Sequence, residues 1–427
     1  MLNKKVYIID YELLSPIAEG ASNLISSIEK NFCAEGFVNR VDTAGIPFKK
    51  AAEIKYDLKK YYHDEPQSLK DACFSDRKLE LTVACYGKAK IRMEKLISLF
   101  ESERTGVIMG VGADVIPLEL YEEEIINYAS KNLDPLIELE FKINKNDIRL
   151  NTVNNPYDIH ALYLAQKMNA GAFQRSTLTA CVSSTQALAF AADSINDNEA
   201  DVVIAGGTDS LVNLVAMSSF GKLGVIPESR EALNCRPFDV NRNGALAGEC
   251  AGFVIMASEE FVEKHNLKPV AEFMGYGNTL DAYKITAPDP EGSSITLAIK
   301  NAIENSGIDI NQIDYINAHG TGTKHNDQLE LKCLEKALGQ KARSIPISST
   351  KDRHGHAIAA AGIQEVCLLI ELMKNNTIPA NLNLLNPCDS DFNLIRENFK
   401  SPIEFALTNN FSFGGVNTVL VLKNKMI

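Results

Sequence analysis

The sequence predicts an α/β fold, because short β-branched or apolar runs alternate with helical stretches along the chain. With 427 residues, the chain is long enough for two to three average domains or one large duplicated domain. The expected strands are VYIID (6–10), GVIMGVGA (106–113), VVIAGGTD (202–209) and GFVIMAS (252–258). The expected helices are TQALAFAADSI (185–195), SITLAIKNAIENSG (294–307) and LELKCLEKALG (329–339).

The composition narrows the classes of function. Hydrophobic residues make up 45% of the chain, so a large core can be buried. The formal net charge is −12, from 43 basic and 55 acidic residues. This charge argues against general nucleic-acid binding, which needs a basic surface. It leaves room for an acidic protein partner, since a local basic patch can form on an acidic protein.

The sequence also indicates in which cellular compartment the protein is located. No run approaches the roughly 18 apolar residues of a membrane span. The N-terminus reaches Asp10 too early for a secretory signal. Nine cysteines without metal-ligand spacing suggest reduced thiols, so a cytoplasmic protein that does not bind membranes is expected.

The expected organisation is two halves, at 1–260 and 261–427. The polar segment KHNLKPV (264–270) follows a finished strand, and AEFMGYG (271–277) then starts a second α/β series. Residues 115–150 suggest a helical insertion that carries no recognisable chemistry.

The first chemical motif is TLTACVSST (177–185), which places Cys181 at the expected start of a helix. Unpaired N–H groups and the helix dipole at such a start favour a thiolate. A free cysteine is usually only a buried packing residue, and for an arbitrary cysteine that alternative is favoured about four to one.

Two further motifs carry imidazoles. In NAHGTGT (317–323), His319 is expected at the carboxyl end of a strand, where ligand sites of α/β proteins lie. In SSTKDRHGHAIAAAG (348–362), Lys351 precedes His354 and His356 among small apolar residues. The H-G-H pair could bind zinc, but no matching ligand spacing accompanies it, so no metal is expected.

The fourth motif is NNFSFGGVN (409–417), where two glycines would let the backbone approach a ligand closely. Phe413 before them could form the wall of a narrow pocket, although an ordinary turn between strands remains an alternative.

With these four motifs in this order, the chain resembles the β-ketoacyl-ACP synthases of the elongating branch of the thiolase superfamily. The resemblance runs almost without gaps over 150–427 and includes RPFDVNRNGALAGE (236–249) and DAYKITAPDPEG (281–292). It implies a thiolase-like duplicated α/β/α/β/α five-layer sandwich. It also implies decarboxylative condensation of an acyl thioester with malonyl-ACP, in fatty-acid or specialised polyene or polyketide elongation.

The resemblance assigns roles to the residues of the motifs. Cys181 would accept the acyl group, while His319 and His356 would bind the malonyl thioester carbonyl. Lys351 and Glu330 would form a supporting ion pair beside the histidines. The other implied roles are gate and oxyanion donor for Phe413, phosphopantetheine binding for Thr321 and Thr323, and carrier-protein docking for Arg77 and Lys78.

No cofactor is implied, since the phosphopantetheine arrives on the acyl carrier protein. The expected assembly is a homodimer or a heterodimer with a chain-length-factor-like subunit, and activity could depend on the latter. A CoA-dependent thiolase is an alternative, but it would need a second catalytic cysteine near the C-terminus. Initiating ketosynthases pair one histidine with asparagine, whereas this chain has His356.

Some positions depart from the family pattern. His354 stands where threonine is usual, Val182 follows the cysteine where a smaller residue is common, and Ser412 and Val416 replace a glycine and a threonine. These departures leave the acyl chain length and the pathway open.

Overall fold

The computed structural model describes residues 4–113, 157–228 and 235–426. The expected insertion at 115–150 lies outside this part of the chain.

The strands in the described part follow the expected pattern. They are β1 (Val6–Ser15), β2 (Ala18–Glu19), β3 (Glu35–Phe37), β4 (Lys50–Ala52), β5 (Thr105–Val111), β6 (Phe173–Thr177), β7 (Val202–Ser210), β8 (Ala247–Ser258), β9 (Ala271–Leu280), β10 (Ile313–Asn317), β11 (Ile347–Ser348), β12 (Thr377–Ile378), β13 (Phe399–Lys400), β14 (Phe405–Phe411) and β15 (Val416–Asn424). Ten of them form one continuous path in the order β11-β10-β14-β15-β9-β1-β8-β7-β5-β6. The expected strands therefore exist, at nearly the expected positions.

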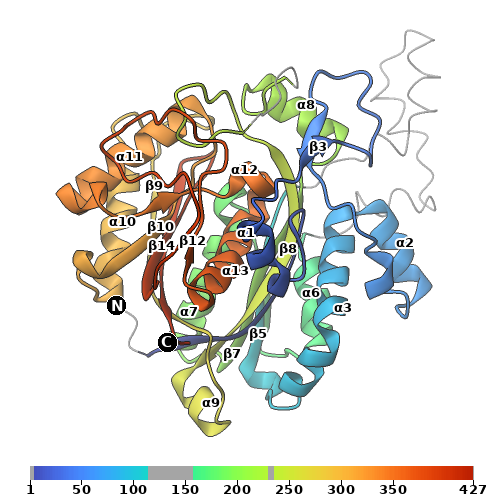
Figure 1. Cartoon of the computed structure of the whole chain (residues 1–427). Coiled ribbons are helices and arrows are strands. Elements are labelled where there is room, and N and C mark those ends of the chain that lie inside the picture. The colour runs from blue at the N-terminus through green and yellow to red at the C-terminus, as the bar shows by residue number, and fades with distance from the viewer. Residues whose placement is uncertain (1–3, 114–156, 229–234, 427) are drawn as a thin grey trace.

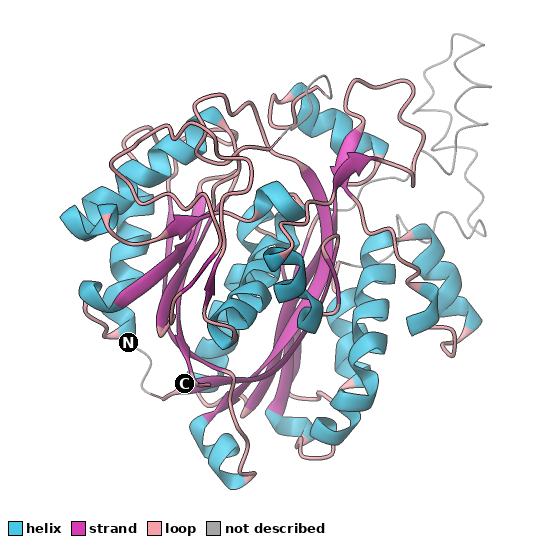
Figure 2. Ribbon diagram, viewed as in Figure 1, coloured by secondary structure: helices cyan, strands magenta, loops and turns pink. Residues whose placement is uncertain are grey.

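The helices cover both faces of these strands (Figure 2). They are α1 (Leu24–Glu29), α2 (Gln67–Ser75), α3 (Arg77–Ile97), α6 (Ile159–Lys167), α7 (Ser183–Asn196), α8 (Leu214–Lys222), α9 (Glu259–Lys264), α10 (Ser293–Ser306), α11 (Lys324–Leu338), α12 (Lys351–His354) and α13 (Ala361–Lys374). Of these described helices, none is long and apolar enough to cross a membrane.

The two halves have the same strand topology. In the first, β6, β5 and β7 are parallel, and the antiparallel β8 and β1 follow. In the second, β11, β10 and β14 are parallel, and the antiparallel β15 and β9 follow. The halves join where β1 pairs with β9.

The layers are α10 and α11, one half-sheet, α7 and α13, the other half-sheet, and α3 with α6 (Figure 1). Three main apolar clusters fill the spaces between these layers. This is the predicted five-layer α/β/α/β/α sandwich. The helices α7 and α13 are enclosed on both sides, so most residues of α7 and nearly all of α13 are buried.

Close packing of the two central helices brings the halves together. A Cβ added at Gly362 of α13 would lie 2.0 Å from Thr185 Oγ1 of α7. Only glycine fits at this contact. Because Cys181 comes just before α7 and His356 just before α13, this contact also sets the distance between them.

Candidate active site

Cys181 lies in a tight turn between β6 and α7. A short 3-10 turn spans Ala180–Val182 and α7 begins at Ser183, as the sequence predicted. Ala180 has φ 50°, a left-handed conformation that an alanine rarely adopts. The Ser183 hydroxyl holds the turn by accepting from Thr179 N at 2.9 Å and donating to Ala180 O at 2.8 Å. The turn thus places the thiol at the start of the central helix.

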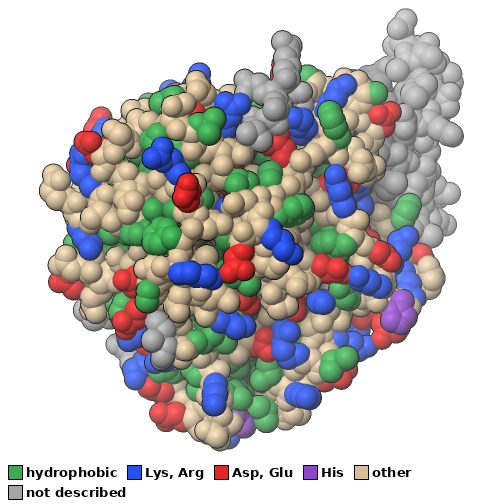
Figure 3. All heavy atoms as spheres, viewed as in Figure 1, with side chains coloured by type: hydrophobic (Ala, Val, Ile, Leu, Met, Phe, Trp, Pro, Cys, Tyr) green, Lys and Arg blue, Asp and Glu red, His purple; other side chains and the backbone are tan. Residues whose placement is uncertain are grey.

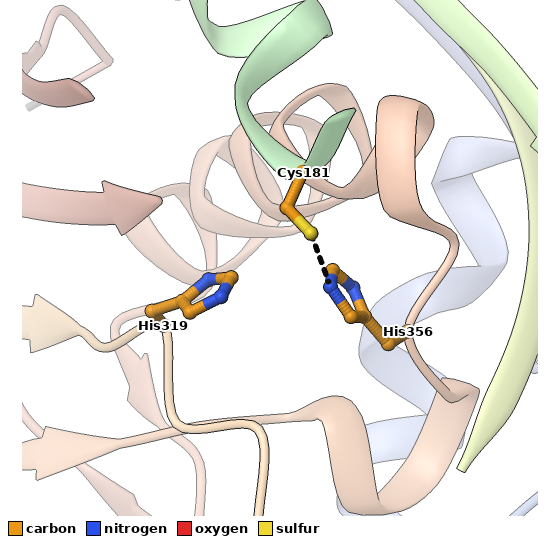
Figure 4. A group of neighbouring side chains, drawn as sticks. All are labelled: Cys181, His319 and His356. Carbon is orange, nitrogen blue, oxygen red and sulfur yellow. Dashed lines mark hydrogen bonds between the residues drawn. The ribbon is translucent and has the colours of Figure 1, made fainter. Parts of the chain in front are cut away.

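The two imidazoles meet this thiol. His356 Nε2 lies 3.0 Å from Cys181 Sγ (Figure 4). The rings of His319 and His356 are 5.4 Å apart between centroids and nearly perpendicular. All three side chains are at most 6% exposed. Residues from three distant motifs therefore form one buried cluster.

The backbone on either side of His356 is held by strand β8. His356 N donates to Leu246 O at 2.7 Å, and Gly248 N donates to His356 O at 3.1 Å. A Cβ at the preceding Gly355, which has φ 71°, would lie 2.6 Å from Ala247 O. The ring of His356 consequently projects from a fixed backbone toward Cys181.

His354 does not reach the thiol. One ring nitrogen lies 2.9 Å from the Thr350 hydroxyl, and the other donates to Gly355 O at 2.8 Å. Burial, followed by the charge of Lys351, lowers the pKa of His354 to about 3. Both nitrogens are therefore used within the loop, and the ring is neutral.

Lys351 is buried between the two histidine segments. Its ammonium donates to His319 O at 2.7 Å and forms an ion pair with Glu365 of α13. The predicted ion pair with Glu330 is wrong. The physical reason is that Glu330 is already used elsewhere, while Glu365 projects from the enclosed helix directly toward Lys351.

Glu330 instead holds the turn that carries His319. Its carboxylate accepts from His319 N at 2.8 Å, from Gly320 N at 2.9 Å and from Asn409 Nδ2 at 3.0 Å. Burial raises the pKa of Glu330 to about 7. Asp327, one helical turn earlier, accepts from Gly322 N at 3.1 Å and extends the same support.

Sequence reasoning missed Glu365, Asn409 and Asn410. Asn410 Nδ2 donates to Glu365 Oε2 at 2.7 Å, and the Thr185 hydroxyl donates to Asn410. A signal existed in each case: Glu365 is an acid within an apolar helical run, and the two asparagines end a buried strand.

Burial sets the protonation states of the catalytic cluster. It lowers the pKa of His319 and of His356 well below the ordinary value, and the positive charge of Lys351 lowers both further. Burial raises the pKa of the Cys181 thiol to about 12, although Lys351 and the backbone N–H groups of Phe413 and Cys181 act in the opposite direction. Burial therefore opposes the thiolate that the sequence favours, and it keeps the two imidazoles neutral.

Phe413 lies in the turn between β14 and β15. Its ring stacks on Phe220 of α8, with centroids 6.2 Å apart and planes 12° apart. Ser412, which departs from the family pattern, closes this turn, since its hydroxyl donates to Val416 O at 3.0 Å. Gly414 and Gly415 follow with φ of 85° and 79°.

A cavity of about 570 Å³ lies beside the cluster. Ala180, Phe220 and Ile358, which pack in one apolar cluster with Cys181, line part of this cavity, while α8 and the start of α3 line the rest. Thr321 and Thr323 lie on the His319 turn, and their hydroxyls are 2.9 Å apart.

Arg77 and Lys78 are not accessible surface cations. Arg77 bonds to both carboxylate oxygens of Glu249, at 2.9 and 2.7 Å, and to Glu80 at 2.7 Å. Lys78 is 8% exposed and donates to Gly112 O at 3.1 Å. At the start of α3 both side chains turn inward to pair with buried groups, and their role in docking stays a prediction.

Comparison with known proteins agrees with this fold and site. The family described as "Beta-ketoacyl synthase, N-terminal domain" matches residues 15–261, and "Beta-ketoacyl synthase, C-terminal domain" matches residues 270–385. The chain belongs to the β-ketoacyl synthase family, whose members are acyl-transferring condensing enzymes.

Particular relatives cover nearly the whole chain. It is 28% identical over 428 residues to "3-oxoacyl-[acyl-carrier-protein] synthase 2" of Coxiella burnetii, covering 99% of both chains. It is 30% identical over 446 residues to the "Putative 3-oxoacyl-[acyl-carrier-protein] synthase, mitochondrial" of Schizosaccharomyces pombe, covering 98% of this chain and 99% of the relative.

Solved structures share the fold. A β-ketoacyl synthase from Burkholderia phymatum has a TM-score of 0.81 at 24% identity, with 99% of both chains covered. A type II polyketide ketosynthase, solved with its acyl carrier protein, has a TM-score of 0.81 at 23% identity over the same coverage.

Proposed function

We propose that this chain is a β-ketoacyl-ACP synthase that condenses an acyl group held on Cys181 with malonyl-ACP, in fatty-acid or polyketide chain elongation. The observation that carries the proposal is the buried cluster of one thiol and two neutral imidazoles. A thioester can be stored on the sulfur. Two N–H donors can stabilise an enolate without adding a proton to it.

Acyl transfer starts from the neutral thiol. His356 Nε2, 3.0 Å from Sγ, takes the thiol proton as the sulfur attacks the thioester carbonyl. The S–C bond to Cys181 forms and the S–C bond to the carrier's pantetheine breaks. The imidazolium then returns the proton to the departing pantetheine thiolate, so His356 is neutral again.

Condensation follows on the acylated sulfur. The C–C bond to the malonyl carboxylate breaks and carbon dioxide leaves. The electron pair of that bond stays with the remaining thioester and forms the enolate. The ring N–H of His319 stabilises the thioester oxygen, and His356 does the same after its proton has moved from Nδ1 to Nε2. The enolate carbon attacks the acyl carbonyl, and the Cys181 thiolate leaves and recovers a proton from solvent.

The backbone N–H groups of Cys181 and Phe413 are proposed to bind the oxyanion of each tetrahedral intermediate. Both act on the Cys181 sulfur by lowering its pKa, which supports their orientation toward the reacting centre. Phe413 would also act as the gate, because its stacking partner Phe220 lines the adjacent cavity. That cavity would take the acyl chain.

The remaining residues are proposed to support the catalytic cluster or to bind the phosphopantetheine arm. Lys351, fixed by Glu365, keeps the imidazoles neutral and anchors the His319 backbone. Thr321 and Thr323 would bind the phosphopantetheine arm, so the protein would need no cofactor of its own.

The partners are an acyl carrier protein and a second subunit. Because Arg77 and Lys78 are paired with buried groups, other cations would contribute to a carrier-docking surface. On the face drawn in Figure 3, basic and acidic side chains are interspersed without a large area of one sign. Cytoplasmic localisation stays a prediction.

A second subunit would pair along β6. This strand ends the path of described strands, and Leu178 directly after it is 50% exposed. An end strand offers unpaired N–H and C=O groups to another chain. One structural neighbour, described as "The ishigamide ketosynthase/chain length factor", suggests that the second subunit could be a chain-length-factor-like protein instead of another copy.

A CoA-dependent thiolase reaction is less well supported. The group of close ligating side chains around Cys181 holds two imidazoles and no second thiol, in a structure that describes all nine cysteines.

Intact-mass measurement after incubation with a series of acyl-ACPs tests the proposal. One acyl group per chain is expected on Cys181. The acyl length that reacts best reports how long a chain the cavity accepts. When malonyl-ACP is then added, the acyl group should leave Cys181 as part of a β-ketoacyl-ACP. Acylation by acyl-CoA alone, without any reaction of acyl-ACP, would contradict the proposal.

A further inference from the structure

Three metal-ligating atoms converge in the active site. The sulfur of Cys181 and one ring nitrogen each of His319 and His356 all lie within 4.8 Å of one another, and all three residues are buried. The sequence argued against a metal because no ligand spacing was visible. The ligands come from three segments that only the fold brings together, so spacing along the chain could not show them.

We propose that Cys181, His319 and His356 bind one Zn²⁺ ion, and that this ion inhibits the enzyme reversibly by occupying the nucleophile. One thiolate and two imidazoles are preferred zinc ligands. Three protein ligands with a fourth open position form a common type of zinc site.

The dimensions fit a tetrahedral ion after small movements. Zinc bonds of about 2.3 Å to sulfur and about 2.0–2.1 Å to nitrogen place ligand atoms roughly 3.5 Å apart. The observed Sγ–Nε2 distance for His356 is 3.0 Å, and no pair exceeds 4.8 Å. Side-chain rotations of about an ångström therefore complete the site.

The charges around the cluster also allow a cation. Each imidazole has two ring nitrogens, and the one that carries no proton can offer its lone pair to a cation. The charged or titratable groups that influence the cluster are Lys351, Asp209 and His354. Lys351 opposes a cation, and its ion pair with Glu365 reduces this opposition without removing it.

The binding step balances without any redox change. The S–H bond of Cys181 breaks, a Zn–S bond forms, and the proton goes to solvent. Each imidazole donates one ring nitrogen lone pair and keeps its proton on the other nitrogen.

The consequence is mutual exclusion between zinc and the acyl group, since both need the same sulfur. Zinc bound to the free enzyme would shield the Cys181 thiol from chemical modification, and the acyl-enzyme would not bind zinc. Zinc binding itself rests on the geometry alone and goes beyond the proposed condensation.

Calorimetric titration of the full chain with Zn²⁺ at neutral pH tests the site. One ion per chain is expected. Cys181→Ala, His319→Ala and His356→Ala should each weaken affinity more than about tenfold, since loss of even an outer-shell partner costs about 10–100-fold. His354→Ala is the matched control: it removes a neighbouring imidazole that bonds only within its own loop, and affinity should not change.

A second measurement uses the wild-type chain, in case a variant does not fold. Zinc should slow modification of Cys181 by methyl methanethiosulfonate, followed by peptide mapping, and a chelator should restore it. Neither measurement needs turnover, so a failure of the condensation proposal would leave the zinc result interpretable. Unchanged zinc affinity in folded Cys181→Ala, or no protection of the thiol, would overturn the proposal and indicate an ion bound elsewhere.

Discussion

The two halves of the molecule repeat one topology but contribute different chemistry. The turn between β6 and α7 in the first half corresponds to the turns between β11 and α13 in the second. The first turn carries Cys181 and is held by the Ser183 hydroxyl. The second carries His356 and Lys351 and contains a buried ion pair.

The ends of the corresponding strands differ in the same way. Strand β10 is followed by His319, whereas β5 is followed by Gly112, where a Cβ would lie 2.2 Å from Asp209. A duplicated scaffold thus supplies the same positions twice. The nucleophile side has small neutral residues, which leaves space beside Cys181, and the histidine side has fixed charges, which hold the imidazoles neutral and in place.

The largest effect is expected from the nucleophile side. Cys181→Ala should abolish acyl-enzyme formation and condensation, because no other thiol lies in the cluster of described residues. Intact mass after incubation with acyl-ACP measures this, with Cys33→Ser as the control. An acyl group still gained by Cys181→Ala would show that the nucleophile lies elsewhere.

The next effect separates the two histidines. His319→Ala and His356→Ala should each slow malonyl decarboxylation by more than about a hundredfold, or about 3 kcal/mol, because each removes one enolate donor. Only His356→Ala should also slow acylation, since His356 lies 3.0 Å from Sγ. Release of carbon dioxide and single-turnover acylation report the two steps. His354→Ala should be milder, and an equal loss there would mean that it shares the role.

A substitution at Arg77 tests whether the buried ion pair of Arg77 and Glu249 in the first half stabilises the fold. Arg77→Ala should lower the free energy of unfolding by about 3–5 kcal/mol, because it leaves a buried carboxylate without its partner. The side chain of that partner, Glu249, is 0% exposed. Denaturant unfolding checks this, with Lys60→Ala as a surface control expected to cost under about 1 kcal/mol. Unchanged stability, with a raised KM for acyl-ACP but not for a small pantetheine thioester, would support the docking role.

A substitution at Glu330 tests whether its carboxylate holds the turn that carries His319 in the second half. Glu330→Gln should cost about 1–3 kcal/mol of stability, because one amide oxygen cannot replace both carboxylate oxygens and a buried N–H group is left unpaired. Chemical denaturation measures the cost, and Glu335→Gln on the same helix is the half-exposed control. Equal stability of the two variants would mean that Glu330 does not hold the turn.

The smallest effect concerns pH. Decarboxylation should show no inflection near pH 6.5, because the lowered pKa values keep His319 and His356 neutral until the pH falls well below that value. Lys351→Met should move the acid limb of the profile to higher pH, since it removes the charge that helps to lower both pKa values. An acid limb near pH 6.5 in both the wild type and Glu330→Gln, which lacks the carboxyl whose pKa is raised to about 7, would show that the imidazoles are not shielded from solvent.

Local sequence predicted much of the molecule. The β-branched runs became strands, and the helix after Cys181 and the strand before His319 lie where the pattern placed them. The fold class follows from the alternation of strands and helices, while the family and the joint role of Cys181, His319 and His356 follow from the resemblance that the four motifs carry.

The errors concern partners distant in sequence. The pairing of Lys351 with Glu365, the inward turn of Arg77 and Lys78, and the raised thiol pKa each depend on which groups the packed layers enclose together.

The sequence by itself determined the class of fold and the chemical groups, because periodicity and motif spacing act over short stretches of chain. Only the tertiary structure decided which carboxylate neutralises which cation and which side chains lose water. The Lys351–Glu365 pair depends on α13 packed between the two half-sheets, and the Arg77–Glu249 pair on α3 packed against β8. Such long-range packing has no counterpart in the spacing of residues along the chain.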